Sequence, residues 1–215
     1  MRMNKKPILI GITGGSGSGK TTIADCLAKS FGLESAVLIS EDDYYKDTSL
    51  MPGFDEPDFD FDTPEIRDHE LLLGHIIMFK AGVGFEKPIY DFTKHCRSEN
   101  IHLIEPCDIW ILEGTHALHC PQIRAQLDLK IFVDTSENVR YRRRLRRDVE
   151  ERARTPESVI AQFWTSVRPG HDKWTEPQKA YADIILSGGQ DIAPISDAEM
   201  EHAISTIKKA LKIGE

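Results

Sequence analysis

Residues 11–22, GITGGSGSGKTT, decide the fold of this 215-residue chain. Five glycines stand here between an apolar run, PILIGIT at 7–13, and a helix-like stretch at 20–31. Because glycine loses more conformational freedom on folding than any other residue, such a cluster indicates a backbone that approaches something closely. The stretch fits the pattern GxxxxGK[ST] in its required setting, after a strand and before a helix. It therefore predicts a phosphate-binding loop for a nucleoside triphosphate.

The chemistry of this loop follows from its residues. Glycines allow successive backbone N–H groups to turn inward around an anion, and the helix N-terminus adds partial positive charge. Lys20 is expected to reach the β- and γ-phosphates, and the Thr21 hydroxyl to bind Mg²⁺. The alternative is a flexible glycine turn without a ligand, which the complete motif disfavours. The residues predicted to bind ATP here are Gly14, Gly15, Ser16, Gly17, Ser18, Gly19, Lys20, Thr21 and Thr22.

Length and composition limit the other possibilities. The chain is long enough for one sizeable core, so we expect a single domain over 1–215. Its net charge of −8 disfavours nucleic acid as a partner. No apolar run reaches the 18 or so residues of a membrane span. The four cysteines have no metal-ligand spacing and are predicted to be reduced thiols of a cytoplasmic protein.

Short apolar runs alternate with helix-like stretches along the chain. This order predicts an α/β fold, a parallel sheet with helices on both faces. The further strands are expected at 36–40, 107–114, 129–135 and 181–186, and the helices at 20–31, 65–80, 136–151 and near the C-terminus. Residues 83–106 break the alternation and are predicted to form a β-hairpin insertion. The polar stretch 46–65 is predicted to be a loop over a site.

Two carboxylates follow predicted strands. Asp42 lies in SEDDYYK at 40–46, where it could accept the proton of an attacking hydroxyl or hold a metal-bound water; an acidic helix cap is an equal alternative. Glu113 ends a hydrophobic strand, the kind of position from which a carboxylate binds Mg²⁺, although a solubilising residue is the alternative. The absence of an NKxD motif disfavours a GTPase.

At this point the chain resembles the uridine kinase (uridine–cytidine kinase) family, from Ile8 to about Asp191. The matching pieces, in order, are GITGGSGSGKTT, SEDDYYK, DFDTPE, PIYDFTKH, ILEGTHAL, IFVDT, RRRLRRDVEERAR, QFWTSVRP and YADIIL. The resemblance implies a five-stranded parallel P-loop sheet with a hairpin beside the nucleoside. It also implies Mg²⁺-dependent transfer of the γ-phosphate of ATP or GTP to the 5′-hydroxyl of uridine or cytidine. Family members are often tetramers, so a homo-oligomer with small-molecule substrates is expected.

The resemblance also implies an acceptor site. The family binds ribose with the Asp of an FD.P motif, which occurs twice here, at 54–57 and 61–64. We favour Asp62 over Asp55, because DHELL follows the second copy; two solvated loop acids are the alternative. The other residues that match the nucleoside site are Tyr45, Tyr90, Phe92 and His95. Thr63 departs from the family, which usually has His there.

Residues 142–154, RRRLRRDVEERAR, form the most basic stretch of an acidic chain. A lid over phosphates, within about 137–157, fits phosphoryl transfer best, since arginine stabilises the charge that develops there. A solvated helix face, with i,i+4 pairs between Arg144 and Asp148 and between Arg147 and Glu151, and a nucleic-acid contact are the alternatives. By family match, Arg147 and Arg152 contact phosphates, Arg147 as a catalytic residue. Arg144, Arg154 and Gln162 contact the nucleoside, and Asp191 lies near the donor.

Three functions remain open from the sequence. The first is a pyrimidine ribonucleoside kinase. The second is a related kinase for another hydroxylated acceptor, such as phosphoribulose, pantothenate or a different nucleoside. The third is a catalytically silent nucleotide-binding module, which the joint presence of Lys20, Thr21, Asp42 and Glu113 disfavours. The SGG at 187–189 replaces a family PRG turn beside the adenine of the donor, so ATP and GTP both stay open as donors.

Overall fold

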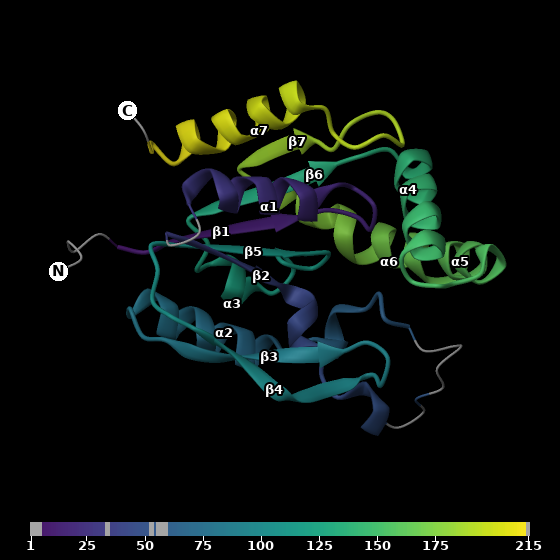
Figure 1. Ribbon diagram of the computed structural model, residues 1–215, viewed down its shortest axis with the longest axis horizontal. Helices are drawn as coiled ribbons and strands as arrows, with labels where there is room; N and C mark the ends of the chain where they lie inside the picture. Colours follow the sequence, from purple (N-terminus) through teal and green to yellow (C-terminus); the bar gives the residue numbers. More distant parts are fainter. Residues whose placement is uncertain (1–5, 33–34, 52–53, 55–59, 214–215) are drawn as a thin grey trace.

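Five parallel strands, in the order β2-β5-β1-β6-β7, form the central sheet of the protein (Figure 1). The computed structural model describes residues 6–32, 35–51, 54 and 60–213. The strands are β1 (Ile8–Thr13), β2 (Ala36–Ser40), β5 (Ile109–Gly114), β6 (Leu129–Asp134) and β7 (Ile184–Ser187). The predicted parallel five-stranded α/β sheet is confirmed.

The register of the sheet brings the predicted site residues together at one edge. Thr13 at the end of β1 pairs with Gly114 of β5, and Ser40 at the end of β2 pairs with Glu113. Because all strands are parallel, the segments that leave their carboxyl ends meet along this edge, where α/β proteins bind ligands. The phosphate-binding loop follows β1 there.

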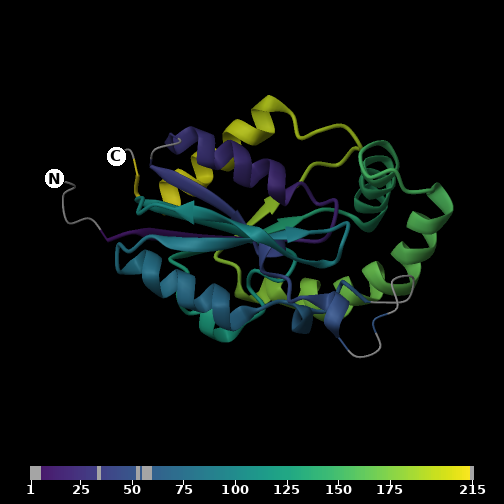
Figure 2. The same ribbon diagram turned by 60° about the horizontal axis from the view of Figure 1, so that its bottom comes forward.

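Helices cover both faces of the sheet (Figures 1 and 2). On one face, α1 (Lys20–Phe31) and α7 (Asp197–Ala210) contribute side chains such as Leu27 and Ile207, which are fully buried against Ile10. On the other face, α2 (His69–Lys80), α3 (Pro121–Arg124) and the hairpin pack over Trp110 and Leu112. Each such side chain stabilises the fold by about 1.5–3 kcal/mol.

The predicted hairpin forms from β3 (Phe85–Asp91) and β4 (Cys96–Ile104), which pair antiparallel. Phe85 anchors the hairpin by stacking on Trp110 of the sheet, with 5.2 Å between ring centroids. The turn of the hairpin includes His95, whose φ of 54° is in the left-handed region. The hairpin tip therefore carries Phe92 and His95 beyond the edge of the sheet.

The start of one helix differs from the sequence prediction. The helix expected from residue 65 begins at His69, because Asp68 caps it by accepting a hydrogen bond from the Leu71 N–H, and Pro64–Ile66 form a separate 3₁₀ turn. The arginine-rich helix α4 (Glu137–Glu150) lies within the predicted 136–151.

None of the helices in the described part of the chain combines the length and the apolar character that a bilayer span requires.

A long helical segment after α4 was not predicted. It consists of α5 (Pro156–Gln162), a π-helical turn (Phe163–Val167), α6 (Arg168–Gly170), a second π-helical turn (His171–Thr175) and a 3₁₀ turn (Glu176–Tyr181). Pro169 lies inside this segment and has no N–H to donate to the carbonyl four residues earlier. The π-helical turns accommodate that missing bond. Together, α4 and α5 form one wall of the site.

Candidate active site

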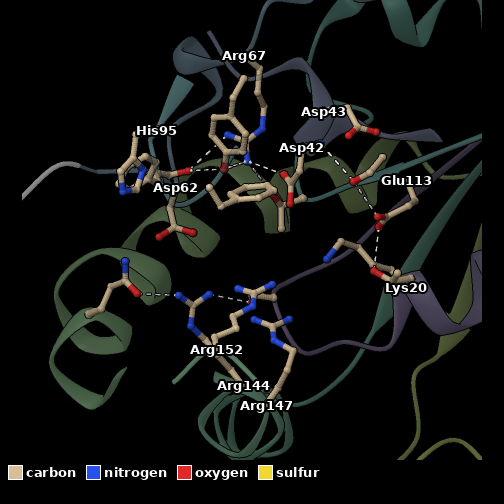
Figure 3. A pocket seen from close by; sticks show the side chains of 18 of the residues that line it. Lys20, Asp42, Asp43, Asp62, Arg67, His95, Glu113, Arg144, Arg147 and Arg152 are labelled. Carbon is tan, nitrogen blue, oxygen red and sulfur yellow. Dashed lines mark hydrogen bonds and ion pairs between the residues drawn. The ribbon is translucent and has the colours of Figure 1, made fainter. Parts of the chain in front are cut away.

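A cavity of about 840 Å³ lies at the carboxyl edge of the sheet. Its walls come from the phosphate-binding loop, the segments after β2 and β5, the loop before α2, the hairpin tip, and the helices α4 and α5. The residues that line it are Ser16, Lys20, Thr21, Ser40, Asp42, Asp43, Tyr45, Phe61, Asp62, Arg67, Phe92, His95, Glu113, Thr115, Arg144, Arg147, Arg152, Arg154 and Gln162. Figure 3 shows the arginines of the α4 region on one side and the Asp42 and Asp62 carboxylates on the other.

The phosphate-binding loop takes its shape from glycines that no other residue could replace without strain. Gly17 has φ of 80°, and a Cβ atom there would lie 2.4 Å from the carbonyl oxygen of Arg140. Gly19, with φ of 92°, caps the N-terminus of α1. The first residues of α1, Lys20 and Thr21, line the cavity, so this helix N-terminus lies where anion binding requires it.

Lys20 and Glu113 bring opposite charges to the base of the cavity. The Thr21 hydroxyl donates to Glu113 Oε2 over 3.1 Å, and the Ser40 hydroxyl donates to Glu113 Oε1 over 3.0 Å. Burial raises the pKa of Glu113, while Lys20 acts to lower it. Burial lowers the pKa of Lys20, against the attraction of Glu113 and Asp42. Glu113 therefore lies inside the site rather than on the solvated surface.

Asp42 belongs to a short 3₁₀ helix (Glu41–Tyr44) whose cap is Ser40, because the Ser40 hydroxyl accepts from the Asp42 N–H. The carboxylate of Asp42 is thus not the cap. It is about half exposed to the cavity, and Arg67 Nη2 lies 3.5 Å from its Oδ1. Its accessible oxygen atoms suit proton acceptance or metal binding.

Asp62 lies across the cavity from the phosphate-binding loop. Its Oδ2 accepts a hydrogen bond from the Ser166 hydroxyl at 3.2 Å. Burial raises the pKa of Asp62, and Arg144 opposes this effect. Asp55, the alternative ribose ligand, lies outside the described residues, so the choice between the two stays a prediction.

Aromatic rings form the outer part of the cavity. His95 stacks on Phe61 with 5.0 Å between centroids, and Phe92 is more than half exposed. Tyr45 contacts both Phe61 and Phe92 edge-on. Tyr90 does not line the cavity: its ring packs under Tyr45, and its hydroxyl lies 2.8 Å from the Thr48 hydroxyl.

Four arginines converge on Asp148, whose side chain is fully buried. The distances between arginine nitrogens and Asp148 oxygens are 3.4 Å for Arg144, 2.8 Å for Arg147, 3.5 Å for Arg152 and 3.8 Å for Arg154. Arg144 and Arg154 also donate to the side-chain oxygen of Gln162. The predicted Arg144–Asp148 pair is present, whereas the guanidinium of Arg147 forms its ion pair with Asp148. All four arginines line the cavity, which a solvated helix face would not require.

Some predicted residues lie outside the cavity lining. Thr22 is exposed on α1, and only Ser16, Lys20 and Thr21 of the phosphate-binding loop line the cavity. The backbone carbonyl of Asp191 accepts from Arg143. The roles assigned to these residues from the family resemblance stay predictions.

Comparisons with known proteins assign the sequence to a family. The sequence matches the model of the Phosphoribulokinase / Uridine kinase family over residues 9–193. The chain belongs to this family. It is 46% identical over 186 residues to a protein named uridine kinase from Alkaliphilus metalliredigens (strain QYMF), covering 86% of this chain and 89% of that protein. It is 48% identical over 185 residues to a uridine kinase from Clostridium botulinum (strain Langeland / NCTC 10281 / Type F), covering 86% and 90%.

Solved structures of other P-loop kinases share the fold of this family member. A putative fructose transport system kinase from Silicibacter sp. TM1040 superposes with a TM-score of 0.68 at 20% identity, over 86% of this chain and 93% of that one. A phosphoribulokinase from Rhodobacter spheroides gives a TM-score of 0.61 at 18% identity, over 86% and 71%. These identities support the fold and not a common substrate.

Several lining residues of this family member were not found by sequence reasoning. They are Ser40, Asp43, Phe61, Arg67 and Thr115. Ser40, Asp43, Phe61 and Thr115 lie inside motifs that were recognised, close to the residues chosen from them. Arg67 had no such signal, because an isolated arginine in a polar loop is most often a surface residue.

Proposed function

We propose that the protein is a pyrimidine ribonucleoside kinase, which transfers the γ-phosphate of ATP or GTP to the 5′-hydroxyl of uridine or cytidine, producing UMP or CMP for pyrimidine salvage. One observation carries this proposal: a phosphate-binding loop with its carboxylates and a polar-aromatic acceptor pocket line the same cavity. The uridine kinase relatives support the choice of acceptor.

The donor triphosphate would bind the phosphate-binding loop. Lys20 would neutralise the β- and γ-phosphates, and the bound phosphates would favour its charged form, against the burial that lowers its pKa. Arg147 and Arg152, which line the same cavity as Lys20, would bind the equatorial oxygens of the transferred group.

The oxygen atoms near Lys20 fit Mg²⁺, a hard cation that prefers carboxylate, hydroxyl and phosphate oxygens. Thr21, Glu113 and Asp42 would hold the ion together with the donor phosphates. When bound, Mg²⁺ supplies positive charge that stabilises the negative charge of the transferred group. The hydrogen bonds from Thr21 and Ser40 keep the Glu113 carboxylate directed at this position.

Asp42 would accept the proton of the attacking hydroxyl, since its carboxylate is exposed between the Lys20–Glu113 pair and the acceptor pocket. Asp62 would bind the ribose hydroxyls, held in place by Ser166. The pyrimidine would lie against Phe92 and the stacked pair of Phe61 and His95. Closure of the α4 region would exclude water, which otherwise competes with the nucleoside as acceptor.

The cellular setting and assembly form part of the same proposal. We expect the enzyme to act in the cytoplasm as a homo-oligomer such as a tetramer, with small molecules and neither nucleic acid nor membrane as partners. Size-exclusion chromatography with light scattering tests the oligomer, and a monomer at working concentration would contradict it.

A coupled ADP-release assay tests the function. Purified protein with Mg·ATP is offered uridine, cytidine, deoxycytidine, adenosine, ribulose 5-phosphate and pantothenate. We expect turnover with uridine and cytidine at least about 100-fold above the other acceptors, as the loss of several specific hydrogen bonds implies. Faster turnover with ribulose 5-phosphate or pantothenate would contradict the proposed acceptor.

A further inference from the structure

Arg67 occupies an unusual position for an arginine. It follows the 3₁₀ turn Pro64–Ile66, and its guanidinium lines the cavity although the residue is only 3% exposed. Backbone hydrogen bonds from Lys46 to Ile66 and from Asp68 to Tyr44 tie its segment to the chain that follows β2. Arginine is rarely buried to this degree unless its charge and its donors are satisfied.

The guanidinium of Arg67 joins segments that are far apart in the sequence. Its Nη1 donates to the Thr63 carbonyl over 2.7 Å and, more weakly, to the Phe61 carbonyl over 3.5 Å. These carbonyls belong to the acceptor loop, which we define as residues 60–63 and which carries Asp62. Because both contacts are to backbone atoms, Arg67 fixes the path of this loop.

The Nη2 atom of Arg67 faces the opposite way, toward the proposed base. It donates to the Tyr45 hydroxyl over 2.8 Å, to Asp42 Oδ1 over 3.5 Å and to the Thr115 hydroxyl over 3.4 Å. One planar group therefore contacts the segments after β2 and β5 and the acceptor loop. Figure 3 shows Arg67 above Asp42, on the far side of the cavity from the α4 arginines.

The remaining nitrogen of Arg67 faces a second buried charge. Its Nε lies 3.7 Å from Oε2 of Glu41, a residue that is 1% exposed. Burial acts to raise the pKa of Glu41, but His69 and Arg67 outweigh it and hold the pKa at about 2. The buried Glu41 carboxylate and the Arg67 guanidinium thus face each other at ion-pair distance.

These contacts distinguish a positioning role from substrate binding. Both Nη atoms donate to oxygen atoms of the protein, and Nε lies at ion-pair distance from Glu41 without a hydrogen-bond partner among the described residues, so the guanidinium is directed at the protein rather than at a ligand. A lysine could supply the charge from a single point but could not span three segments with a rigid planar group.

We propose that Arg67 is a positioning residue that holds the Asp42 carboxylate and the acceptor loop in one fixed arrangement. The proposal rests on the proposed kinase function for its kinetic consequences. Proton acceptance by Asp42 and nucleoside binding by Asp62 then depend on the same side chain, since a displacement of about 1 Å at either group can lower the rate about 100-fold.

The variants Arg67→Lys and Arg67→Met test this proposal. Arg67→Lys keeps a positive charge beside the buried Glu41 carboxylate, so it remains informative if Arg67→Met does not fold. The matched control is Arg124→Lys, because Arg124 also donates to two backbone carbonyls, those of Leu118 and His119, and does not line the cavity. The measurements are kcat and KM for uridine and for ATP, and the thermal midpoint.

We expect Arg67→Lys to lose at least about 30-fold in kcat/KM for uridine, through lower kcat and higher uridine KM, while the ATP KM stays within about threefold. The Arg124→Lys control should keep wild-type kinetics. Wild-type kcat/KM in a folded Arg67→Lys variant would overturn the proposal. A lower kcat with both KM values unchanged and a matching loss of folded protein would also overturn it, because that pattern indicates a purely structural role.

Hydrogen–deuterium exchange separates this inference from the proposed function. In Arg67→Lys, we expect faster exchange in residues 41–46 and 60–68, and unchanged exchange in the phosphate-binding loop. If the wild-type protein phosphorylates none of the acceptors, the proposed function fails, and the exchange result still tests Arg67. Unchanged exchange in both segments would overturn the positioning role whatever the activity.

Discussion

The hydroxyl of Thr21 donates a hydrogen bond of 3.1 Å to the carboxylate of Glu113, 92 residues further along the chain. The first residue belongs to the phosphate-binding loop and the second to the end of β5. This contact places two predicted Mg²⁺ ligands side by side and next to Lys20, at the position where the donor phosphates would bind. The sequence motif supplies Thr21, and the parallel pairing of β1 with β5 brings Glu113 next to it.

Replacing Glu113 tests this metal site. Glu113→Gln keeps the size and the hydrogen-bond acceptor but removes the charge, so we expect the Mg²⁺ concentration for half-maximal activity to rise at least about tenfold. The measurement is a Mg²⁺ titration at fixed ATP. Glu105→Gln, at an exposed position, is the control. An unchanged Mg²⁺ requirement would remove Glu113 from the site.

Asp42→Asn tests the proposed base. The amide cannot accept the proton, so we expect kcat to fall by about 10²–10⁴-fold. Binding of a fluorescent ATP analogue should stay within about threefold, because the phosphate-binding loop is intact. Asp108→Asn, at an exposed site before β5, controls for a change of charge. Activity above a tenth of wild type would exclude Asp42 as the base.

Asp148 is expected to organise the arginines of the α4 region. Asp148→Asn leaves four arginines around a neutral amide, so they should repel one another and leave the positions from which they line the cavity. We expect a loss of about 2 kcal/mol in stability, discounted for the partial exposure of the arginines, and a fall in thermal midpoint of about 4–8 °C. We also expect kcat to fall at least about tenfold. Glu150→Gln, on the exposed side of α4, is the control and should change neither the thermal midpoint nor kcat. A wild-type thermal midpoint and kcat in Asp148→Asn would contradict the organising role of Asp148.

His116 makes stability depend on pH. It is buried, and its Nε2 lies 3.0 Å from the Asp62 carbonyl, which can only accept, so the neutral ring carries its proton on Nε2. Burial and the charge of Arg67 lower the pKa of His116 to about 3. The unfolded chain thus binds this proton more readily than the folded one below pH 6.5, its ordinary pKa. The stabilisation is complete above about pH 6.5 and is lost as the pH falls toward 3.

Urea unfolding between pH 4.5 and 7.5 measures this effect. We expect the free energy of unfolding to decrease with falling pH in the wild type, and to decrease less in His116→Gln, whose amide can still donate to the Asp62 carbonyl without titrating. Identical slopes in the two proteins would show that His116 does not contribute.

The parts of the site that are local in sequence could be predicted, and the parts that depend on packing could not. Lys20 and Thr21 stand in a motif that fixes its own conformation, and Asp42 and Glu113 follow strands whose parallel order brings them together. Tyr90 stands in a matched motif as well, yet its ring lies beneath Tyr45 rather than in the cavity lining.

Arg67 and Asp148 show why the remainder could not be found. The partners of Arg67 come from three segments, and those of Asp148 reach it from both sides of the turn after α4. Helical periodicity pairs Arg147 with Glu151, but the buried position of Asp148 makes it the better acceptor. Likewise, a proline inside a helical segment usually signals an end, and only the π-helical turns around Pro169 allow residues 156–181 to continue.

Identification of the product tests the central claim most directly. The protein is incubated with Mg·ATP and either uridine or 5′-deoxyuridine, which differs only in lacking the proposed acceptor hydroxyl. Products are identified by mass spectrometry and phosphorus NMR. We predict one UMP for each ADP with uridine, and no phosphorylated product with 5′-deoxyuridine. Phosphate on the 2′- or 3′-hydroxyl, or ADP release that is the same with and without uridine, would contradict the account.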